Sequence, residues 1–556
     1  MQRRTRIAAL AQSIDPERAT AAAARLSPAL QRGSTAHAVA VLLSAAYPAL
    51  APTLEASPEI ARALVDDGTL AARDSTGLAM RIGARVGDLD DVDRVRRELR
   101  RAARDERIRI ALREILPPAL GGADVDVTAR ELSALADVTM EVALAEATRA
   151  TTARFGPPRT SSGALGRFVI LGMGKLGGEE LNAGSDIDLI YFYDTDDGAA
   201  EGGASGPITL HDYWSRVARR LTATLEEVTE DGFVWRVDLR LRPEGRSGPL
   251  VNSLAAAERY YEDFGRLWER AALLRARPSA GDLGFGDELL AMLSPFIWRR
   301  RVDPRVAGEM IQLAQRSRAE LSTHADRDRD LKLGPGGIRE AEFFVQALQL
   351  VWGGKEPRVR ARNTLDGLRR LRAKGFVTDR EAQEIALGYI ALRRAEHAVQ
   401  VASGIQTHVR PDEPAARTRL ARALGFATPE AFEADIKGHM ARISARFLSL
   451  LPEGASSASR FPSVLAALER SNVDAFIETL ARAAGALPEG APPGSPVPDR
   501  WADTARDLLE LARHPDALLG ARSRESFPHL GETIIEAVLD AADPEQAARY
   551  LRVFFA

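Results

Sequence analysis

Two aspartates spaced two residues apart, Asp186 and Asp188, are the side chains in this sequence whose type and spacing point most directly to chemistry. Asp188 lies in a β-branched and aromatic run from Ile187 to Tyr193, which is typical of a buried strand. Because side chains alternate along a strand, both carboxylates are expected on the same face. The segment 233–242 also alternates, and its charged face carries Asp238. We therefore expect two neighbouring strands that bring three carboxylates together.

Three carboxylates in one site raise one another's pKa unless cations compensate for their charge, and hard oxygen ligands favour Mg²⁺ or Mn²⁺. Two such ions about 4 Å apart can hold the attacking and leaving oxygens of an in-line phosphoryl displacement. We predict Asp186, Asp188 and Asp238 to be both the metal ligands and the catalytic residues of a nucleotidyl-transfer site, with two Mg²⁺ ions. A lone Ser-Asp-x-Asp is more often a solvated turn, but the glycine-rich lead from Gly172 and the second strand favour metal binding.

Five further residues are predicted to bind the phosphate groups of the substrate. Gly184 and Ser185 form a turn whose backbone N–H groups and hydroxyl can hold phosphate oxygens. Lys175 adds a compact positive charge, and Arg240 and Arg242 share the predicted strand face of Asp238. The alternative for the two arginines is an exposed strand face of mixed charge.

The composition limits the classes of protein and partner. With 556 residues the chain is too long for one core. Its net charge of −3 provides no field for a polyanion, so we expect no nucleic-acid partner. The absence of cysteine excludes disulfides and thiolate zinc sites. The longest apolar stretch, 38–51, is shorter than the roughly 20 residues that span a bilayer, so we expect no membrane insertion, no export and a cytoplasmic location.

Periodicity predicts an α+β chain in which a mixed-sheet domain is embedded among helices. The expected regions are a helical N-terminal region, a nucleotidyltransferase catalytic domain, a helical domain, a Pro/Gly-rich linker with five prolines between Pro488 and Pro498, and a final helical segment. Their boundaries are set at 1–150, 151–285, 286–455, 456–500 and 501–556.

Downstream, the segment 332–344 is predicted to be a glycine-rich loop that opens a helix. Such a helix start could bind an anion or be an ordinary helix start, and the sequence does not separate the two. Glu342 falls on the apolar side of this helix, so it should have a cationic partner. The aromatic and charged run 260–270 is expected to be a packing helix.

These motifs resemble those of the glutamine synthetase adenylyltransferase family. The matching blocks are GMGKLGGEELNAGSDIDLIYFYD, DGFVWRVDLRLRPEGRSGPL, YYEDFGRLWERAALLRAR and LKLGPGGIREAEFFVQALQL, which together run from about 170 to 352. The resemblance implies a nucleotidyltransferase domain of the DNA polymerase β-like type. It carries the family's metal ligands onto Asp186 and Asp188, with Asp238 as the third.

Members of this family have two tandem catalytic halves, and the details LRLRPEGRSGPL and GGIREAEF are similar to the half that removes AMP. The resemblance thus implies phosphorolysis of adenylylated glutamine synthetase to ADP. It also implies a PII-type nitrogen signal protein as a partner. The second catalytic copy is missing from the sequence, and the final helices look like the start of the family's connector. Either the gene is truncated or the adding half is a separate chain. Two alternatives stay open, namely ATP-dependent adenylylation and a non-catalytic half that senses nucleotide or PII.

Overall fold

The computed structural model describes residues 2–65, 70–300, 305–319 and 328–450, and after 450 it describes 464, 467–468, 473–488, 491–492, 494–514, 517–520, 523 and 530–555. The chain divides into two compact units, Met1–Leu450 and Leu451–Ala556. Each unit has its own buried apolar core. None of the helices within these described ranges is both long and apolar enough to cross a membrane.

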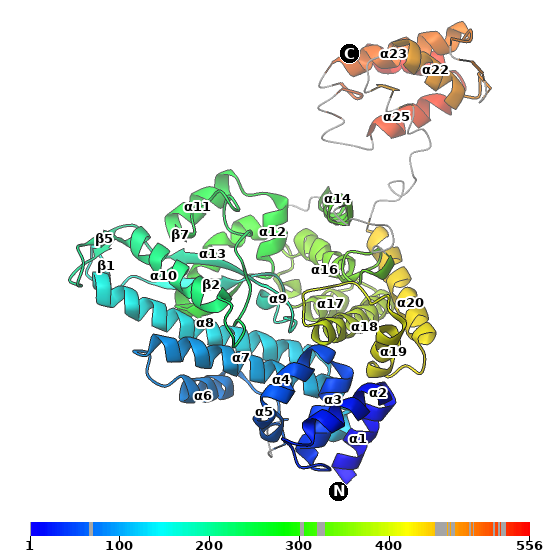
Figure 1. Cartoon of the computed structure of the whole chain (residues 1–556). Helices are drawn as coiled ribbons and strands as arrows, with labels where there is room; N and C mark the ends of the chain where they lie inside the picture. Colours follow the sequence, from blue (N-terminus) through cyan, green and yellow to red (C-terminus); the bar gives the residue numbers. More distant parts are fainter. Residues whose placement is uncertain are drawn as a thin grey trace. The chain divides into compact units, whose positions relative to one another are not determined.

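The N-terminal region is helical, as its Ala, Leu and Arg periodicity predicts (Figure 1). Asp15 caps the second helix through its side chain, and Ser34 caps the third in the same way. The last helix runs to Phe155 and so crosses the predicted boundary at residue 150. The helices are α1 (Gln2–Ile14), α2 (Pro16–Leu26), α3 (Thr35–Ala46), α4 (Ala51–Ala56), α5 (Pro58–Ala63), α6 (Ser75–Val86), α7 (Val92–Ile115) and α8 (Val125–Phe155).

A mixed sheet follows, with the strand order β6-β3-β2-β8 and with β7 also paired to β3. Strand β2 runs antiparallel to both neighbours, whereas β3 runs parallel to β6 and β7. The predicted strands at 168–171 and 187–193 are confirmed. The strands are β2 (Phe168–Gly172), β3 (Ile187–Tyr193), β6 (Val237–Asp238), β7 (Val251–Ser253) and β8 (Arg277–Gly281), and β1 (Pro158–Thr160), β4 (Gly198–Ala200) and β5 (Ile208–Thr209) form a small separate sheet.

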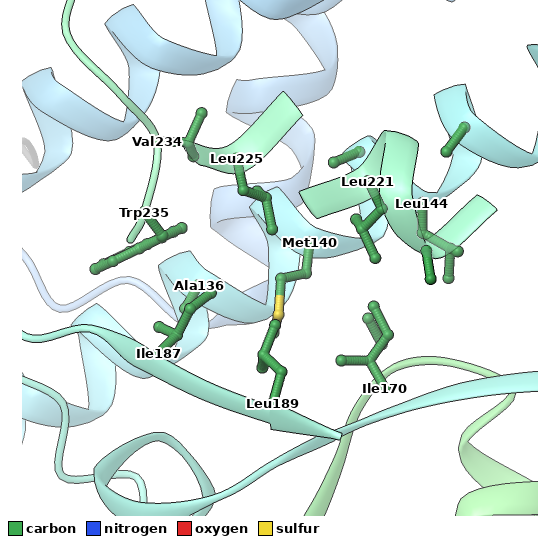
Figure 2. Packing of buried hydrophobic residues seen from close by; sticks show 14 of the residues in the cluster. Ala136, Met140, Leu144, Ile170, Ile187, Leu189, Leu221, Leu225, Val234 and Trp235 are labelled. Carbon is green, nitrogen blue, oxygen red and sulfur yellow. The ribbon is translucent and has the colours of Figure 1, made fainter. Parts of the chain in front are cut away.

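Helices cover both faces of the larger sheet. Ile187 and Leu189 of β3 pack into the same cluster as Met140 of α8 and Leu221 of α10 (Leu210–Glu226) (Figure 2). The alternate residues Ile190 and Phe192 pack into a second cluster on the other face. That cluster includes residues of α11 (Leu254–Asp263), α12 (Leu267–Leu273), α13 (Leu283–Ile297), α14 (Arg305–Ala319) and α16 (Ile338–Trp352).

The rest of the first unit is helical, as predicted for the region after 285. Helix α16 begins directly after the glycine-rich loop at 332–337, and the predicted packing run 260–270 lies in α11 and α12. The long helix α18 starts with a capping box of Thr378 and Glu381. The remaining helices are α17 (Thr364–Ala373), α18 (Asp379–Ser403), α19 (Pro414–Ala423) and α20 (Pro429–Leu448).

The second unit is also helical where it is described. It contains α22 (Val473–Ala483), α23 (Asp499–Arg513), α25 (Leu530–Leu539) and α26 (Pro544–Phe555). Helix α22 lies inside the region 456–500 that was predicted to be a linker. It forms a helix there because Phe476 and Leu480 make an apolar face that is buried against α23. The segment 484–498 contains no helix or strand where it is described, and several residues of the predicted linker, Gly490 and Pro493 among them, lie outside the described residues.

Candidate active site

The turn between β2 and β3 and the parallel pairing of β3 with β6 bring the predicted aspartates together. Ile187 is fully buried in the core, so its neighbours Asp186 and Asp188 face away from that core. In the register of the parallel pair, Asp188 lies opposite Asp238 and Ile187 lies opposite Val237. The prediction that a neighbouring strand carries Asp238 to the Asp188 site is confirmed.

The predicted ten-residue strand at 233–242 is wrong in length, because β6 contains only Val237 and Asp238. Val234 and Trp235 both pack into the cluster on the α8 side of the sheet, whereas consecutive residues of a strand point to opposite faces. Their backbone N–H groups both donate to the carbonyl of Leu225, and Trp235 Nε1 donates to Thr139 Oγ1 of α8 at 2.9 Å. The segment before β6 is therefore anchored on helices instead of extending the sheet.

Burial and the like charges around it perturb the pKa of the Asp188 carboxyl. Burial, and then the charge of Asp238 and to a lesser degree that of Asp186, raises the pKa of Asp188 to about 6, although Lys332 opposes the rise. Within the described part of the chain, the Asp188 carboxylate has no ion pair or hydrogen bond. A desolvated carboxylate without an ion pair or hydrogen bond is stabilised when a cation binds to it.

Gly174 makes room for this carboxylate. A Cβ atom at position 174 would lie 2.5 Å from Asp188 Oδ2, and the φ of Gly174 is +51°, in the left-handed region. Met173 donates its backbone N–H to the carbonyl of Asp188 at 2.9 Å. The glycine-rich turn therefore holds the backbone close against the carboxylate-bearing end of β3.

The other two aspartates have arginine partners. Arg236 Nε donates to Asp186 Oδ1 at 2.6 Å, and its other nitrogen donates to the carbonyl of Gly184. Arg240 Nε donates to Asp238 Oδ2 at 2.8 Å. Burial raises the pKa of Asp238, but the hydrogen bonds and charge of Arg240 outweigh burial and hold it below its usual value. In this arrangement, no group of three or more His, Cys, Asp or Glu side chains among the described residues has the geometry of a metal site.

The donor set fits Mg²⁺ or Mn²⁺ in chemical type. Asp186 and Asp238 lie close enough to Asp188 for their charges to raise its pKa, and all three supply hard carboxylate oxygens. The arginine on Asp238 is largely exposed, with 64% of its side chain accessible, so it can move away at little cost. Binding of a cation to all three aspartates would require Arg236 and Arg240 to release their partners.

Lys175 lies in a buried ion pair, away from the surface. Its Nζ donates to both carboxylate oxygens of Glu396 on α18, at 2.8 and 2.7 Å. Asn182 Nδ2 donates to the same carboxylate at 2.6 Å, and His408 Nδ1 lies 2.9 Å from it. Burial lowers the pKa of Lys175, while Glu396 opposes this change. The structure thus places Lys175 between the helical region that contains α18 and the turn 173–186 that joins β2 to β3, which we call the catalytic turn. Its predicted contact with phosphate stays a prediction.

The remaining predicted phosphate ligands differ in how far their polar groups are already hydrogen-bonded within the chain. Gly184 and Ser185 form a turn in which the N–H of Ser185 donates to the carbonyl of Asn182 at 3.2 Å. Arg240 is engaged by Asp238. The guanidinium of Arg242 donates to backbone carbonyls of its own loop, those of residues 239, 246, 248 and 249. Arg242 therefore organises this loop.

The buried carboxylate of the 332–344 motif has the predicted cationic partner. Arg275 Nη1 lies 3.4 Å from Glu342 Oε1 and 2.8 Å from a carboxylate oxygen of Glu180. Burial raises the pKa of Glu342, but Arg275 first and then other cations outweigh it and lower the pKa. A side chain of α16 itself accepts a hydrogen bond near the start of this helix, since the N–H of Gly336 donates to Glu340 Oε2 at 3.0 Å.

Sequence reasoning missed Arg236, Gly174, Lys332 and Glu396. Arg236 lies one residue before β6, and the predicted alternation over 233–242 already places it on the face of Asp238, so that pattern could have identified it. Gly174 belongs to the quoted motif, but its contact with Asp188 depends on the fold of the turn. Lys332 belongs to the downstream loop, and its proximity to Asp188 is a tertiary feature.

The mixed sheet, the paired strand ends and the clustered aspartates define a nucleotidyltransferase fold of the DNA polymerase β-like class. Residues 37–292 match the family model described as glutamate-ammonia ligase adenylyltransferase, and the chain matches this enzyme family. Residues 306–451 match a second model, described as GlnD PII-uridylyltransferase.

Similar proteins of known name are bifunctional glutamine synthetase adenylyltransferase/adenylyl-removing enzymes. The protein from Burkholderia pseudomallei is 41% identical over 349 residues, which are 61% of this chain and 38% of the relative. The protein from Pseudomonas aeruginosa is 39% identical over 68% of this chain and 38% of the relative. The protein from Thioalkalivibrio sulfidiphilus is 35% identical over 88% of this chain and 49% of the relative. The matched regions thus span less than half of these relatives.

Proposed function

We propose that the chain is a nucleotidyltransferase that removes AMP from an adenylylated tyrosine of glutamine synthetase by phosphorolysis, which yields ADP. The observation that carries the proposal is the register of β3 and β6, which sets Asp188 beside Asp238 with Asp186 two residues away. The names of the relatives, which combine adenylyl transfer and adenylyl removal on glutamine synthetase, support the substrate.

In the proposed site Asp186, Asp188 and Asp238 would hold two Mg²⁺ ions, or Mn²⁺ in their place. When bound, such ions neutralise charge on the reacting phosphoryl group and on the leaving oxygen. The raised pKa of Asp188 supports this role, because its carboxylate is desolvated beside two other carboxylates and has no ion pair or hydrogen bond among the described residues.

The proposed reaction forms a bond from an oxygen of inorganic phosphate to the adenylyl phosphorus and breaks the bond from that phosphorus to the tyrosyl oxygen. The tyrosyl oxygen takes up the proton that the attacking hydrogen phosphate gives up, and the products are ADP and the unmodified tyrosine. Inorganic phosphate is already an anion near neutral pH, so the step needs positioning and charge neutralisation more than a general base. The chain's cationic side chains, rather than a histidine, would carry this work.

Removal of AMP is favoured over addition by the motif details LRLRPEGRSGPL and GGIREAEF, which are similar to the removing half of the family. ATP-dependent adenylylation would use the same carboxylates and is the alternative. The purified chain should form ADP from adenylylated glutamine synthetase, Mg²⁺ and phosphate. It should not modify unadenylylated glutamine synthetase when ATP is supplied. The opposite pattern would reverse the assigned direction.

Asp186→Asn provides the control for this assay, because Asn keeps the size of the side chain and can still accept a hydrogen bond from Arg236. We expect loss of ADP formation with an unchanged far-UV circular dichroism spectrum. Full activity in this variant would refute the role of the carboxylate cluster.

We also propose that the helical region takes a PII-type signal protein as a partner in the cytoplasm. The match of residues 306–451 to the PII-uridylyltransferase model supports this partner. A half that only senses nucleotide or PII, with a separate adenylylating chain as its target, is the alternative function. Calorimetric titration of the chain with unmodified and uridylylated PII-type protein tests the partner, and absence of binding to both forms would refute it.

A further inference from the structure

A cavity of about 440 Å³ lies beside the catalytic turn, on the side of Gly184 and Ser185. One wall is formed by a single face of α7, since the lining residues 104, 107, 108 and 111 are spaced by three or four positions. Other walls come from α4, from the segment 230–236 before β6, and from the end of α18. Arg236 belongs both to this lining and to the ion pair with Asp186, so the cavity adjoins the catalytic carboxylates.

The lining contains a cation that no carboxylate neutralises. Arg107 donates to the backbone carbonyl of Val234, and its guanidinium lies over the ring of Trp235, 4.0 Å from the centroid. Its Nε atom is buried without a hydrogen-bond partner, and the described residues offer it no ion pair. Burial, with a smaller contribution from the charge of Arg236, lowers the pKa of Arg107 to about 9. An anionic ligand would remove this electrostatic cost.

A second unpartnered polar atom lies in the part of the lining that comes from α18. Gln400 of α18 is 2% exposed, and its Nε2 donates to the carbonyl of Thr407. Its Oε1 atom is buried and has no hydrogen-bond partner. A ligand that brings both an anionic oxygen and a hydroxyl would satisfy both walls, and a phosphate group with a protonated oxygen or a neighbouring ribose hydroxyl has that combination.

The acidic members of the lining do not cancel the charge of Arg107. Asp231 is already paired with Arg101, whose Nε donates to its Oδ1 at 2.8 Å. Arg104, which also lines the cavity, is paired with Asp105 at 2.9 Å. Glu230 is the remaining acid in the lining and is exposed. The cavity is therefore cationic at Arg107, whereas the charge of Arg236 is paired with Asp186.

We propose that this cavity is the phosphate-binding subsite of the reaction and that Arg107 is the residue that binds the phosphate group. The role of the subsite in the reaction rests on the proposed function. A phosphate bound in this cavity would lie next to Ser185 and Asp186. It adds residues of α7 and α18 to the predicted Gly184 and Ser185, which line the cavity, and it leaves out the predicted Lys175, Arg240 and Arg242.

The experiment measures binding without turnover. Phosphorus-31 line broadening of inorganic phosphate is recorded with the full chain in metal-free buffer at constant ionic strength, and the titration is repeated with AMP and with ADP. Arg107→Gln should weaken binding by about tenfold or more, which is the effect expected for loss of a charge-assisted hydrogen bond. Arg97→Gln is the matched control, because Arg97 is an exposed residue of the same helix outside the lining, and it should change binding by less than about twofold.

A second variant guards against misfolding of Arg107→Gln. Thr53→Glu on α4 places a carboxylate in the lining from another element, at a partly exposed position. It should weaken phosphate binding while Arg107 is intact. Tight binding of free phosphate would identify the attacking group, whereas binding of AMP or ADP alone would identify the phosphate of the nucleotide.

The outcomes separate the two proposals. Arg107-dependent phosphate binding in a chain that forms no ADP would sustain the subsite and refute the reaction. ADP formation together with phosphate binding that neither Arg107→Gln nor Thr53→Glu alters would overturn the subsite. Asp188→Asn should retain Arg107-dependent binding although it cannot turn over.

Discussion

Glu396 offers the sharpest test of how the catalytic turn is held against the helical region. Its side chain is fully buried and accepts from Lys175 Nζ and Asn182 Nδ2, with His408 Nδ1 2.9 Å away. Arg393 Nε lies 3.4 Å from it within α18. Glu396→Gln keeps the size of the side chain but removes the charge that these groups face.

The expected cost follows from leaving Lys175 and Arg393 buried without their shared counter-ion. Removal of one partner of a buried ion pair costs about 3–5 kcal/mol, because the remaining charge is desolvated and uncompensated. Replacement of both partners by apolar residues, as in Glu396→Leu with Lys175→Met, should cost less than the sum of the single changes. Asn182 and His408 would still lose an acceptor, so recovery is expected to be partial.

Burial raises the pKa of Glu396, but Lys175, His408 and Arg393 outweigh burial and lower it well below the usual value. The stabilisation is therefore fully present above about pH 4.5, the ordinary pKa of the carboxyl, and it is lost as the pH falls through the lower folded pKa. The difference in unfolding free energy between the native protein and Glu396→Gln should be largest near pH 7. It should shrink as the pH falls below about 4.5.

Urea and thermal unfolding of the two proteins, followed by circular dichroism, measure this difference. Glu356→Gln is the matched control, because Glu356 pairs with Lys374 at 3.0 Å near the surface, where water screens the pair, so its loss should cost much less stability. If Glu396→Gln costs no more than Glu356→Gln, or if the changes at Lys175 and Glu396 are additive, the ion pair does not stabilise the turn as reasoned.

Three further changes test the site. Asp188→Asn should abolish ADP formation and weaken Mg²⁺ binding in calorimetry at least about tenfold, and unchanged Mg²⁺ affinity would remove Asp188 from the metal ligands. Gly174→Ala should also weaken Mg²⁺ binding, because its Cβ would lie 2.5 Å from Asp188 Oδ2. Gly202→Ala has a similar positive φ with nothing within 4 Å, so it should cost stability alone; equal effects of the two on Mg²⁺ would contradict the steric argument. Arg242→Met should speed amide hydrogen exchange in the segment 239–249 about tenfold or more, since it removes several hydrogen bonds to carbonyls there; a change confined to phosphate affinity would instead support the predicted phosphate contact.

Local pattern was sufficient for β2 and β3, although not for the length of β6. The apolar runs at 168–171 and 187–193 became β2 and β3, and the alternation within β3 set Asp188 apart from the core. The demand that Glu342 have a cationic partner also followed from its position on an apolar helix face, and it is confirmed. In each case the deciding physics, side-chain alternation or the cost of burying a charge, acts within a few residues.

The sequence by itself determined that an acidic cluster sits at the end of a glycine-led strand among helices, because strand and helix periods are local properties of the chain. Only the tertiary structure decided which charges meet. Lys175 faces Glu396, 221 residues away, and Arg275 faces Glu342, 67 residues away. Tertiary packing also delayed the start of the second strand to Val237, since Val234 and Trp235 both pack against helices in the same cluster instead of alternating. These ion-pair partners are determined by how whole helices and strands pack together, and the local spacing of residues contains no information about that packing.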